Sequence, residues 1–392
     1  MAKRKEIIAM NKHRNREGGH FEFRNDWDPK RVVHVYEPKL GVESILVIDN
    51  TALGPGCAGV RVSSAITPFK IFKLARATTL KCALADIPFG GAMAGIKANP
   101  NEVDKTSLIK SFAEEVSAYI PEECIVAPEM NTGAEEMAAF AEVIGKPYGV
   151  TGKPERVGGI PYELGVIGFG VGIAIETAPQ VAPAIFDRKN IFESTVAMYG
   201  FNAIGSEIAK YLVSKRAKIV AISDFWGGCY NPESIDIRKA LKHACATTEK
   251  KSIKNCKSGT PISKDELLRI DCDVLVFSSW ENVISKYQAS LIRAKCIVEG
   301  GNNLLTPDVE QILHKKGALV IPDILATAGG VIASYAECNG WNPNIAFSVI
   351  ASKIEKNTKL VIQHALNSKL LPRSVCIEWA QNRVKKATEE KI

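Results

Sequence analysis

Long apolar runs and paired cysteines are both missing from this 392-residue chain. No run of about 18 apolar residues occurs, so the sequence predicts no membrane-spanning helix. The first residues are polar and basic, with no apolar segment behind them, which argues against a secretory signal. The ten cysteines are scattered and include no Cys-x-x-Cys pair. This pattern is typical of reduced, mostly buried thiols. Together these absences predict a cytoplasmic protein without membrane contact and without a bound metal.

The charges of the chain are not balanced: it has 50 lysines and arginines but 43 aspartates and glutamates, which gives a formal net charge of +7. Part of the excess lies in residues 1–31. A basic run can be a nucleic-acid-binding arm. Here acidic residues interrupt it, and no aromatic side chains alternate with it. We therefore interpret residues 1–31 as a solvated or subunit-contacting helix, and nucleic acid is not the expected partner.

The first half of the sequence has the pattern of a mixed α/β unit. Residues 1–40 are polar and predict a helix followed by a connector. Periodicity then predicts strands at 44–49, 60–62 and 124–127, and helices at 68–86, 103–119 and 133–145. A Gly/Pro-rich stretch at 151–165 marks the expected domain boundary.

The second half is more regular, because short apolar strands alternate with helical segments. A linking helix is expected over about 168–185, and helices are expected again from about 328 to 390. Strands are expected at 194–199, 217–224, 274–277, 296–298 and 318–321. This alternation predicts an α/β fold with a parallel, doubly wound sheet.

One turn in the second half has the form of a dinucleotide-binding turn. Gly200 and Gly205 occupy the first and third glycine positions of Gly-x-Gly-x-x-Gly, and Asn202 occupies the second. At Asn202 a side chain would intrude on the phosphate, although asparagine tolerates a left-handed backbone. Asp224 ends the next strand, where a carboxylate would meet a ribose hydroxyl. Two interpretations stay open: a dinucleotide site, or a Rossmann sheet that has lost its cofactor.

Residues 81–96 are the most distinctive stretch in the first half. Lys81 lies near the end of the helix expected at 68–86, and Pro88 stops that helix. Gly90 and Gly91 then predict a tight turn that brings backbone close to whatever lies above it. A basic residue beside such a turn is suited to gripping a small anion.

This stretch resembles the glutamate/leucine/phenylalanine/valine dehydrogenase family, whose helix-ending lysine is followed by Gly-Gly-x-Lys-x-Gly. The resemblance extends from about residue 40 to residue 340. The other segments that carry it are 54–61, 151–154, 158–159, 224–232, 281–284, 299–302, 322–326, 328–331 and Ser334. It implies a glutamate dehydrogenase-like protein, oxidative deamination of an amino acid with NAD or NADP, and a hexamer.

The resemblance also implies how the chain is divided. Residues 1–165 would form a substrate-binding and oligomerisation domain, completed by C-terminal helices at about 335–392. Residues 166–334 would form the Rossmann dinucleotide-binding domain. The substrate-binding residues it implies are Lys81, Gly90, Gly91, Cys57, Ala127, Ser334 and Val331. The cofactor-binding residues it implies are Gly200, Asn202, Ala203, Ile204, Gly205, Asp224 and Asn302.

Several positions depart from the family pattern. Met93 replaces the catalytic lysine, Glu129 replaces the proton-shuttling aspartate, and Cys57 replaces the lysine that binds a substrate γ-carboxylate. Further departures are Glu163, Ile167, Phe169 and Thr327. Hydride leaves Cα only when the substrate amine is neutral, so the reaction needs a nearby base. Met93 cannot accept a proton, and Lys97, about 13 Å further along an extended strand, is too far away to replace it.

These departures lead to three hypotheses. The first is a homologue with lost or strongly impaired activity that acts as a partner subunit, in a homo-oligomer or with a catalytic paralogue, or as a sensor of a small-molecule ligand. The second is an active oxidoreductase with an altered amino-acid or oxo-acid substrate that uses Lys81 and Glu129. The third is a nucleic-acid binder acting through residues 1–31.

Overall fold

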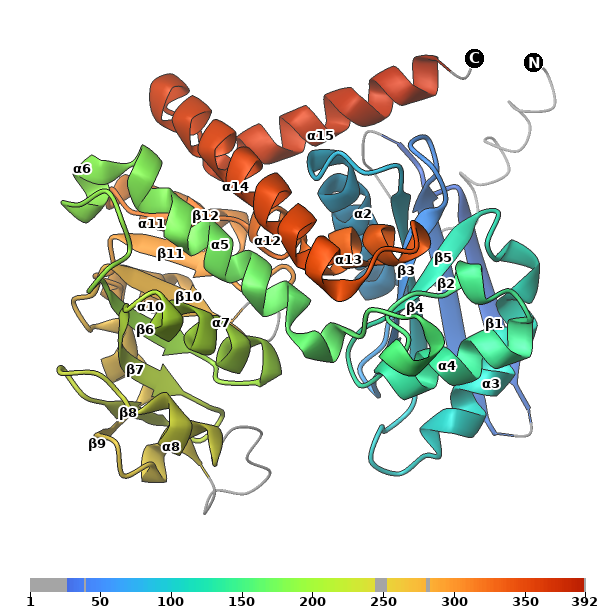
Figure 1. Cartoon of the computed structure of the whole chain (residues 1–392), viewed down its shortest axis with the longest axis horizontal. Coiled ribbons are helices and arrows are strands. Elements are labelled where there is room, and N and C mark those ends of the chain that lie inside the picture. The colour runs from blue at the N-terminus through green and yellow to red at the C-terminus, as the bar shows by residue number, and fades with distance from the viewer. Residues whose placement is uncertain (1–26, 39, 244–251, 280–282, 391–392) are drawn as a thin grey trace, which may run out of the picture.

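The computed structural model describes residues 27–38, 40–243, 252–279 and 283–390. The basic segment at 1–26 lies outside them. The chain forms two α/β domains, each built on its own sheet, with long helices between and above them (Figure 1). The predicted fold class is confirmed.

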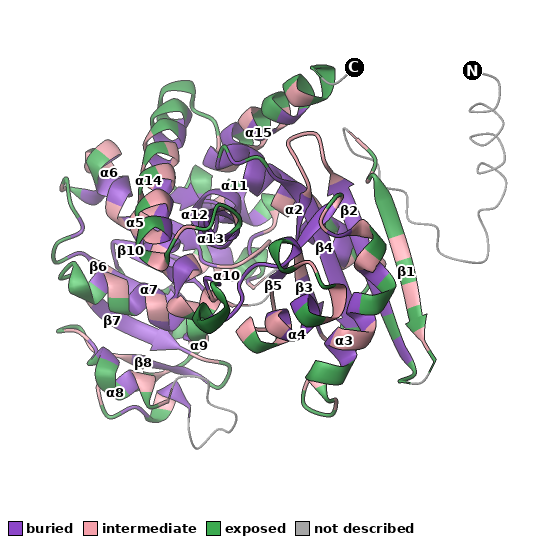
Figure 2. Ribbon diagram, turned by 45° about the vertical axis from the view of Figure 1, so that its right-hand side comes forward, coloured by how far each residue is buried: buried purple, intermediate pink, exposed green. Residues whose placement is uncertain are grey.

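The first domain contains a five-stranded sheet of order β1-β2-β4-β3-β5. Its strands are β1 (Arg31–Glu37), β2 (Val42–Asn50), β3 (Gly56–Val62), β4 (Gly90–Lys97) and β5 (Cys124–Pro128). β3, β4 and β5 are parallel, whereas β1 and β2 are antiparallel additions. The expectation of helix and connector over residues 1–40 was wrong for β1, an edge strand whose side chains are largely exposed (Figure 2).

Helix α2 (Pro68–Leu84) covers one face of this sheet, and α3 (Lys105–Val116) and α4 (Ala134–Ile144) cover the other. The Thr67 hydroxyl caps α2 by accepting from the amide of Lys70, and Pro68 occupies its first turn.

The turn predicted at Gly90 and Gly91 was wrong, because both residues open the strand β4 with extended backbone. Glycine is required at both positions because neighbouring backbone atoms leave no room for a Cβ. A Cβ on Gly90 would lie 1.9 Å from the carbonyl oxygen of Asn50, and one on Gly91 would lie 2.2 Å from the backbone nitrogen of Thr79. The backbone therefore does come close to its neighbours, which are the end of β2 at Gly90 and α2 at Gly91.

The second domain contains a seven-stranded sheet of order β12-β11-β10-β6-β7-β8-β9. Its strands are β6 (Thr195–Tyr199), β7 (Lys218–Ser223), β8 (Gly228–Tyr230), β9 (Thr260–Ile262), β10 (Val274–Phe277), β11 (Cys296–Glu299) and β12 (Leu319–Ile321). The five predicted strands are parallel, as expected. The antiparallel strands β8 and β9 were not predicted. The helices of this domain are α7 (Ala203–Ser214), α8 (Ile237–Leu241), α9 (Lys264–Leu268), α10 (Lys286–Leu291) and α11 (Pro307–Lys315).

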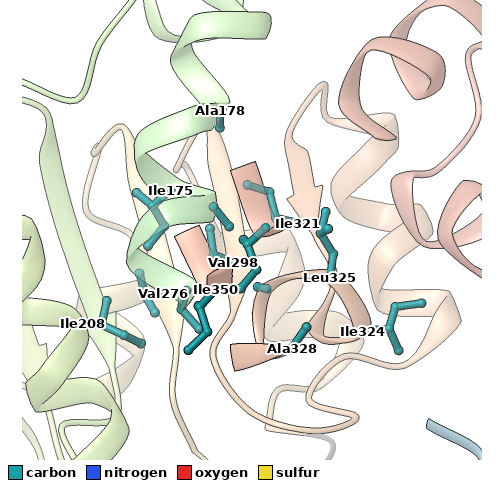
Figure 3. Packing of buried hydrophobic residues seen from close by; sticks show 14 of the residues in the cluster. Ile175, Ala178, Ile208, Val276, Val298, Ile321, Ile324, Leu325, Ala328 and Ile350 are labelled. Atoms are coloured by element: carbon teal, nitrogen blue, oxygen red, sulfur yellow. The ribbon is translucent and has the colours of Figure 1, made fainter. Parts of the chain in front are cut away.

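Helices that precede and follow the second sheet join the two domains. They are α5 (Val166–Val181), α6 (Pro183–Phe186), α12 (Asp323–Ala326), α13 (Gly329–Cys338), α14 (Pro343–Ser368) and α15 (Pro372–Glu389). α14 packs along α5, and α15 packs against α2 of the first domain (Figure 1). The core at this junction includes Ile175, Ile321 and Ile350, which come from three different elements (Figure 3).

One described segment, Tyr162–Val181, is long and apolar enough to span a membrane, although no such run was expected from the sequence. In the structure 61% of its apolar window is buried inside the protein. Phe169 in this segment packs edge-on against Tyr211 of α7 and Phe347 of α14. The segment is therefore a core helix of the domain junction.

Candidate active site

Lys81 lies on α2, where the first domain faces the second. Its side chain is 7% exposed, and its Nζ donates a hydrogen bond to Asn302 Oδ1 at 2.9 Å. Asn302 follows β11, so this bond joins the two domains across 221 positions of sequence. Burial lowers the pKa of Lys81, and the nearby carboxylates of Asp323 and Glu129 oppose that effect. The structure thus brings together two predicted site residues from different domains.

Met93 and Glu129 both lie over Gly59 of β3. A Cβ on Gly59 would come within 3.2 Å of the Met93 sulfur and within 3.1 Å of the Glu129 side chain. In register, Gly59 pairs with Met93 on β4 and with Ala127 on β5. Met93 is 2% exposed and belongs to an apolar cluster with residues such as Ile45 and Ile71. The position of the family lysine is thus part of the packed core beneath α2.

Arg61 engages the carboxylate of Glu129. The two oxygens of Glu129 accept from Arg61 Nε at 2.6 Å and from Arg61 Nη2 at 2.7 Å, and Glu129 Oε2 also accepts from the amide of Met130. Burial favours the neutral acid, but Arg61 outweighs it and lowers the pKa of Glu129. A carboxylate that is held in a two-pronged ion pair and stays ionised is a poor proton shuttle.

Cys57 lies at the other end of the site with Ser334. Burial raises the pKa of the Cys57 thiol to about 12, although the Ser334 hydroxyl and the Lys81 ammonium act in the opposite direction. Cys57, Ala127 and Val331 belong to one buried apolar cluster. This part of the site therefore offers no charge to a second carboxylate on a substrate.

Tyr162, which sequence reasoning missed, closes this end of the site. Its hydroxyl group lies 2.8 Å from Ser334 Oγ and donates to the carbonyl of Gly330 at 2.8 Å. Thr151 donates to the same Ser334 oxygen at 2.8 Å. Ser334 is thereby satisfied by protein groups. No sequence signal marked Tyr162, which lies in a Gly/Pro-rich stretch read only as a boundary.

The β6–α7 turn keeps the outline of a dinucleotide site. Gly200 has a φ of 105°, so it needs to be glycine, whereas Asn202 has a φ of −84° and is not left-handed as the sequence had suggested. Asn202 Oδ1 caps α7 by accepting from the amide of Gly205 at 2.9 Å and from Ser278 Oγ at 2.7 Å. The amides of Ala203 and Ile204 begin the helix and suit a phosphate. The side chain of Asn202 thus accepts a hydrogen bond from the Gly205 amide, which is one of the donors that a phosphate would use.

The carboxylate of Asp224 is hydrogen-bonded to the loop that follows it and to the segment at Ser252 and Ile253. Its Oδ1 accepts from the amides of Trp226 and Gly227 and from Ser252 Oγ, and its Oδ2 accepts from the amide of Ile253 at 2.7 Å. A carboxylate has about four acceptor sites. The turn therefore fits a diphosphate only in part, and Asp224 keeps at most one acceptor position, on Oδ2, for a ribose in this conformation.

A buried charge cluster lies behind Asn302, and sequence reasoning missed it as well. Arg373 of α15 donates to Glu299, to Glu310 at 2.7 Å and to Asp323 at 2.7 Å. Burial and the neighbouring carboxylates raise the pKa of Glu299 to about 8, although Arg373 acts against them. Burial disfavours the ion at Asp323, but Arg373 and Lys81 outweigh it and lower that pKa. The position of Lys81 is thus tied electrostatically to the last helix.

The fold and this site define an α/β protein of two domains with a lysine-bearing helix facing a Rossmann-type sheet, the architecture expected of an amino-acid dehydrogenase. Residues 158–391 match the family described as glutamate/leucine/phenylalanine/valine dehydrogenase. Residues 29–146 match the dimerisation domain of the same family. The chain belongs to the Glu/Leu/Phe/Val dehydrogenase family.

Individual relatives agree with this assignment. The chain is 36% identical to an NADP-specific glutamate dehydrogenase of Saccharolobus shibatae over 329 residues, which cover 81% of this chain and 75% of the relative. It is 36% identical to an NAD-specific glutamate dehydrogenase A of Halobacterium salinarum over 292 residues, covering 72% and 66%. The hetero-hexameric glutamate dehydrogenase from Thermus thermophilus, in its leucine-bound form, superposes with a TM-score of 0.80 at 26% identity, covering 93% and 90%.

Proposed function

We propose that this chain has lost, or retains only weakly, the oxidative deamination of its family, and that it acts as a partner subunit or ligand sensor. The observation that carries the proposal is the ion pair between Arg61 and Glu129 beside Met93. Neutralising the substrate amine requires a base, and adding water to the iminium requires a proton relay. Met93 supplies no proton, and Arg61 holds Glu129, the adjacent candidate relay among the described residues, in its ionised form.

The ligand that this site favours is a small neutral amino acid or oxo acid. Lys81 supports this, because it is the cation placed to hold one carboxylate once its bond to Asn302 opens. Cys57 and its apolar neighbours offer nothing to a second carboxylate. Transferring an unpaired carboxylate into such surroundings is costly, so glutamate is disfavoured.

We assign oligomerisation to residues 1–165 together with the C-terminal helices, and the coenzyme-type domain to residues 166–334. The match of residues 29–146 to a dimerisation domain supports this division. The exposed edge strand β1, with Tyr36 63% exposed, is a surface that a second chain could cover. The hetero-hexameric Thermus relative supports an assembly, either of identical chains or with a catalytic paralogue, and we place that assembly in the cytoplasm.

The second candidate function is an oxidoreductase that uses Lys81 as its base. It is favoured by the lowered pKa of Lys81, because a catalytic lysine must be neutral at working pH. The hydrogen bond from Lys81 to Asn302 and the occupied acceptors of Asp224 weigh against it.

Titration with NADH and with NADPH, followed by fluorescence and by turnover assays on neutral amino acids and glutamate, tests both candidates. We expect weak binding of coenzyme and no turnover with glutamate. Turnover within about tenfold of the usual enzymatic range of roughly 1–1,000 per second would overturn the proposed loss of activity. Failure to bind either coenzyme would remove the second candidate.

A further inference from the structure

A cavity lies in the Rossmann-type domain, at the edge of the sheet opposite the β6–α7 turn. Its volume is about 640 Å³, and it is lined by the ends of α6, α9, α10 and α11 and by the segments that lead into β11 and β12. The amino ends of parallel strands meet at one edge of a sheet. This cavity is at that edge, whereas a dinucleotide would lie at the carboxyl ends.

Four cationic side chains line this cavity, and no acidic residue is among its described lining. The four are Arg269, Arg293, Lys295 and Lys316. Arg269 and Arg293 form no hydrogen bond or ion pair through their side chains with any residue that the structure describes. Partial burial and the nearby Arg293 lower the pKa of Lys316, so these like charges repel one another.

Some nearby groups oppose this positive charge, but they do not cancel it. Lys295 pairs with Asp187 at 3.0 Å and with Asp273 at 3.3 Å. Lys316 Nζ donates to the carbonyls of Ser290 and Ile292 near the end of α10. Those carbonyls carry only partial negative charge. Three of the four cations therefore have no carboxylate partner among the described residues.

We propose that this cavity is a binding site for a small molecule that carries two or more phosphate groups. Arginine presents a planar fork of donors that matches phosphate oxygens, and this site offers two arginines whose side chains have no partner among the described residues. The volume lies within the range of about 300–1,000 Å³ that is usual for small-molecule sites. A ligand of several negative charges would relieve the repulsion between Arg293 and Lys316.

The lining favours a small ligand over a nucleic acid. The apolar members of the lining are aliphatic, including Ile185, Leu291 and Leu313, and none is aromatic. Single strands usually bind where aromatic rings stack against bases. A compact polyphosphate needs only the cations and the hollow between them.

Isothermal titration of the full-length chain with sodium tripolyphosphate, at about 150 mM salt to screen diffuse attraction, tests this site. We expect one ligand per chain with a Kd below about 1 mM, and weaker binding of inorganic phosphate. The double variant Arg269→Ala/Arg293→Ala should bind roughly tenfold more weakly or worse. The control variant Arg238→Ala/Lys239→Ala removes the same charge from exposed positions on α8 and should bind like the wild type.

Several outcomes would overturn the proposal. One is the absence of any heat of binding with the wild type, and another is an equal loss of affinity in the control variant. A third is displacement of tripolyphosphate by NADH, which would place the anion at the β6–α7 turn. Tighter, Arg293-dependent binding of a single-stranded oligonucleotide would overturn the ligand class. If the double variant does not fold, Arg293→Gln alone, checked by circular dichroism, provides the same comparison.

Discussion

Glu129 has one methylene more than the aspartate that the family places at its position, and in this structure its carboxylate pairs with Arg61. The identities of Met93, Glu129 and Cys57 could be read directly from the sequence. The partner of Glu129 could not, because Arg61 and Glu129 meet only when β3 and β5 pair in register. In the sequence, Arg61 stood out only as the last residue of the family-like segment 54–61. Nothing in that segment indicated that it pairs with Glu129.

Restoring the base tests the residue-scale explanation. Met93→Lys alone should give at most a trace of activity, and Met93→Lys/Glu129→Asp should give more than the sum of the single changes, because both groups serve one proton path. The new lysine would be almost fully buried, which lowers its pKa as a base requires. Formation of reduced coenzyme with neutral amino acids and with glutamate measures the effect.

Met93→Leu provides the matched control, because it keeps an apolar side chain of similar size and should stay inactive. We expect the rescued protein to prefer neutral amino acids unless Cys57→Lys is added. A triple variant with Asn202→Gly that binds coenzyme yet turns over no amino or oxo acid would show that the missing base is not the main lesion. Ile167 and Phe169 would then be the next positions to change.

Arg61→Met should destabilise the fold by about 3 kcal/mol, because it leaves a largely buried carboxylate without its partner. The folded-state pKa of Glu129 is depressed, so the stability from this pair is present above pH 4.5 and is lost as pH falls through the folded pKa. Urea unfolding at several pH values should show this acid loss in the wild type and a smaller one in the variant. Arg156→Met, which breaks an exposed pair with Glu135, should change little. Equal stability of wild type and Arg61→Met would contradict the assignment.

At the scale of single elements, the composition of each strand explains whether it was predicted from the sequence. The five parallel strands of the second sheet are apolar and alternate regularly with helices, so periodicity identified them. β4 begins with two glycines, which suggested a turn, whereas in the structure they are extended, pair with β2 and β3, and pack closely against β2 and α2. β8 and β9 have three residues each, like β12, but their sequences Gly-Cys-Tyr and Thr-Pro-Ile lack the apolar run that identified β12.

The β6–α7 turn gives a prediction at this scale. Asn202→Gly should tighten NADH binding by roughly fivefold, because the amide of Gly205 and the hydroxyl of Ser278 lose an internal acceptor and become free for a phosphate. Fluorescence titration measures the change. Asn202→Ser can still cap α7 and should bind like the wild type. Weaker binding by Asn202→Gly would mean that the cap shapes the turn rather than blocking it.

The carboxylates around Arg373 give another prediction. The pKa of Glu299 is raised from 4.5 to about 8, so the folded state holds a proton that the unfolded state loses in that interval. This group therefore makes unfolding easier as pH rises from about 4.5 to about 8, by a few kcal/mol at most. Glu299→Gln should flatten that part of the pH–stability curve measured by urea unfolding. Asp308→Asn, at an exposed position on α11, should leave the slope as it is.

At the scale of the whole molecule, the sequence predicted the α/β class and the family correctly, because the motifs that carry them are local and in the expected order. It did not predict how the domains touch. The bond from Lys81 to Asn302 and the position of Tyr162 depend on contacts between distant segments, for which single-sequence patterns have no signal.

Assembly is tested at this scale. The exposed edge strand β1 and the family match to a dimerisation domain lead us to expect an oligomer at micromolar concentration. Light scattering coupled to size-exclusion chromatography measures the mass, and a stable monomer would count against the proposal. Replacing Val32 and Tyr36 with lysine should shift the mass downward if β1 lies in the contact. The same change at Tyr287, exposed on α10, should not.

The late position of Arg373 in the chain also affects the order in which parts of the protein can fold during synthesis. Glu299, Glu310 and Asp323 leave the ribosome at least 50 residues before the arginine that binds them all. Until then the emerging chain has three carboxylates that cannot be buried together without strong repulsion. We therefore expect closing of the second sheet's edge at β11 and β12 to be unfavourable until α15 has been synthesised, unless one of these carboxyl groups takes up a proton. On this expectation, completion of the second domain is coupled to α15, the helix that also packs against α2 of the first domain.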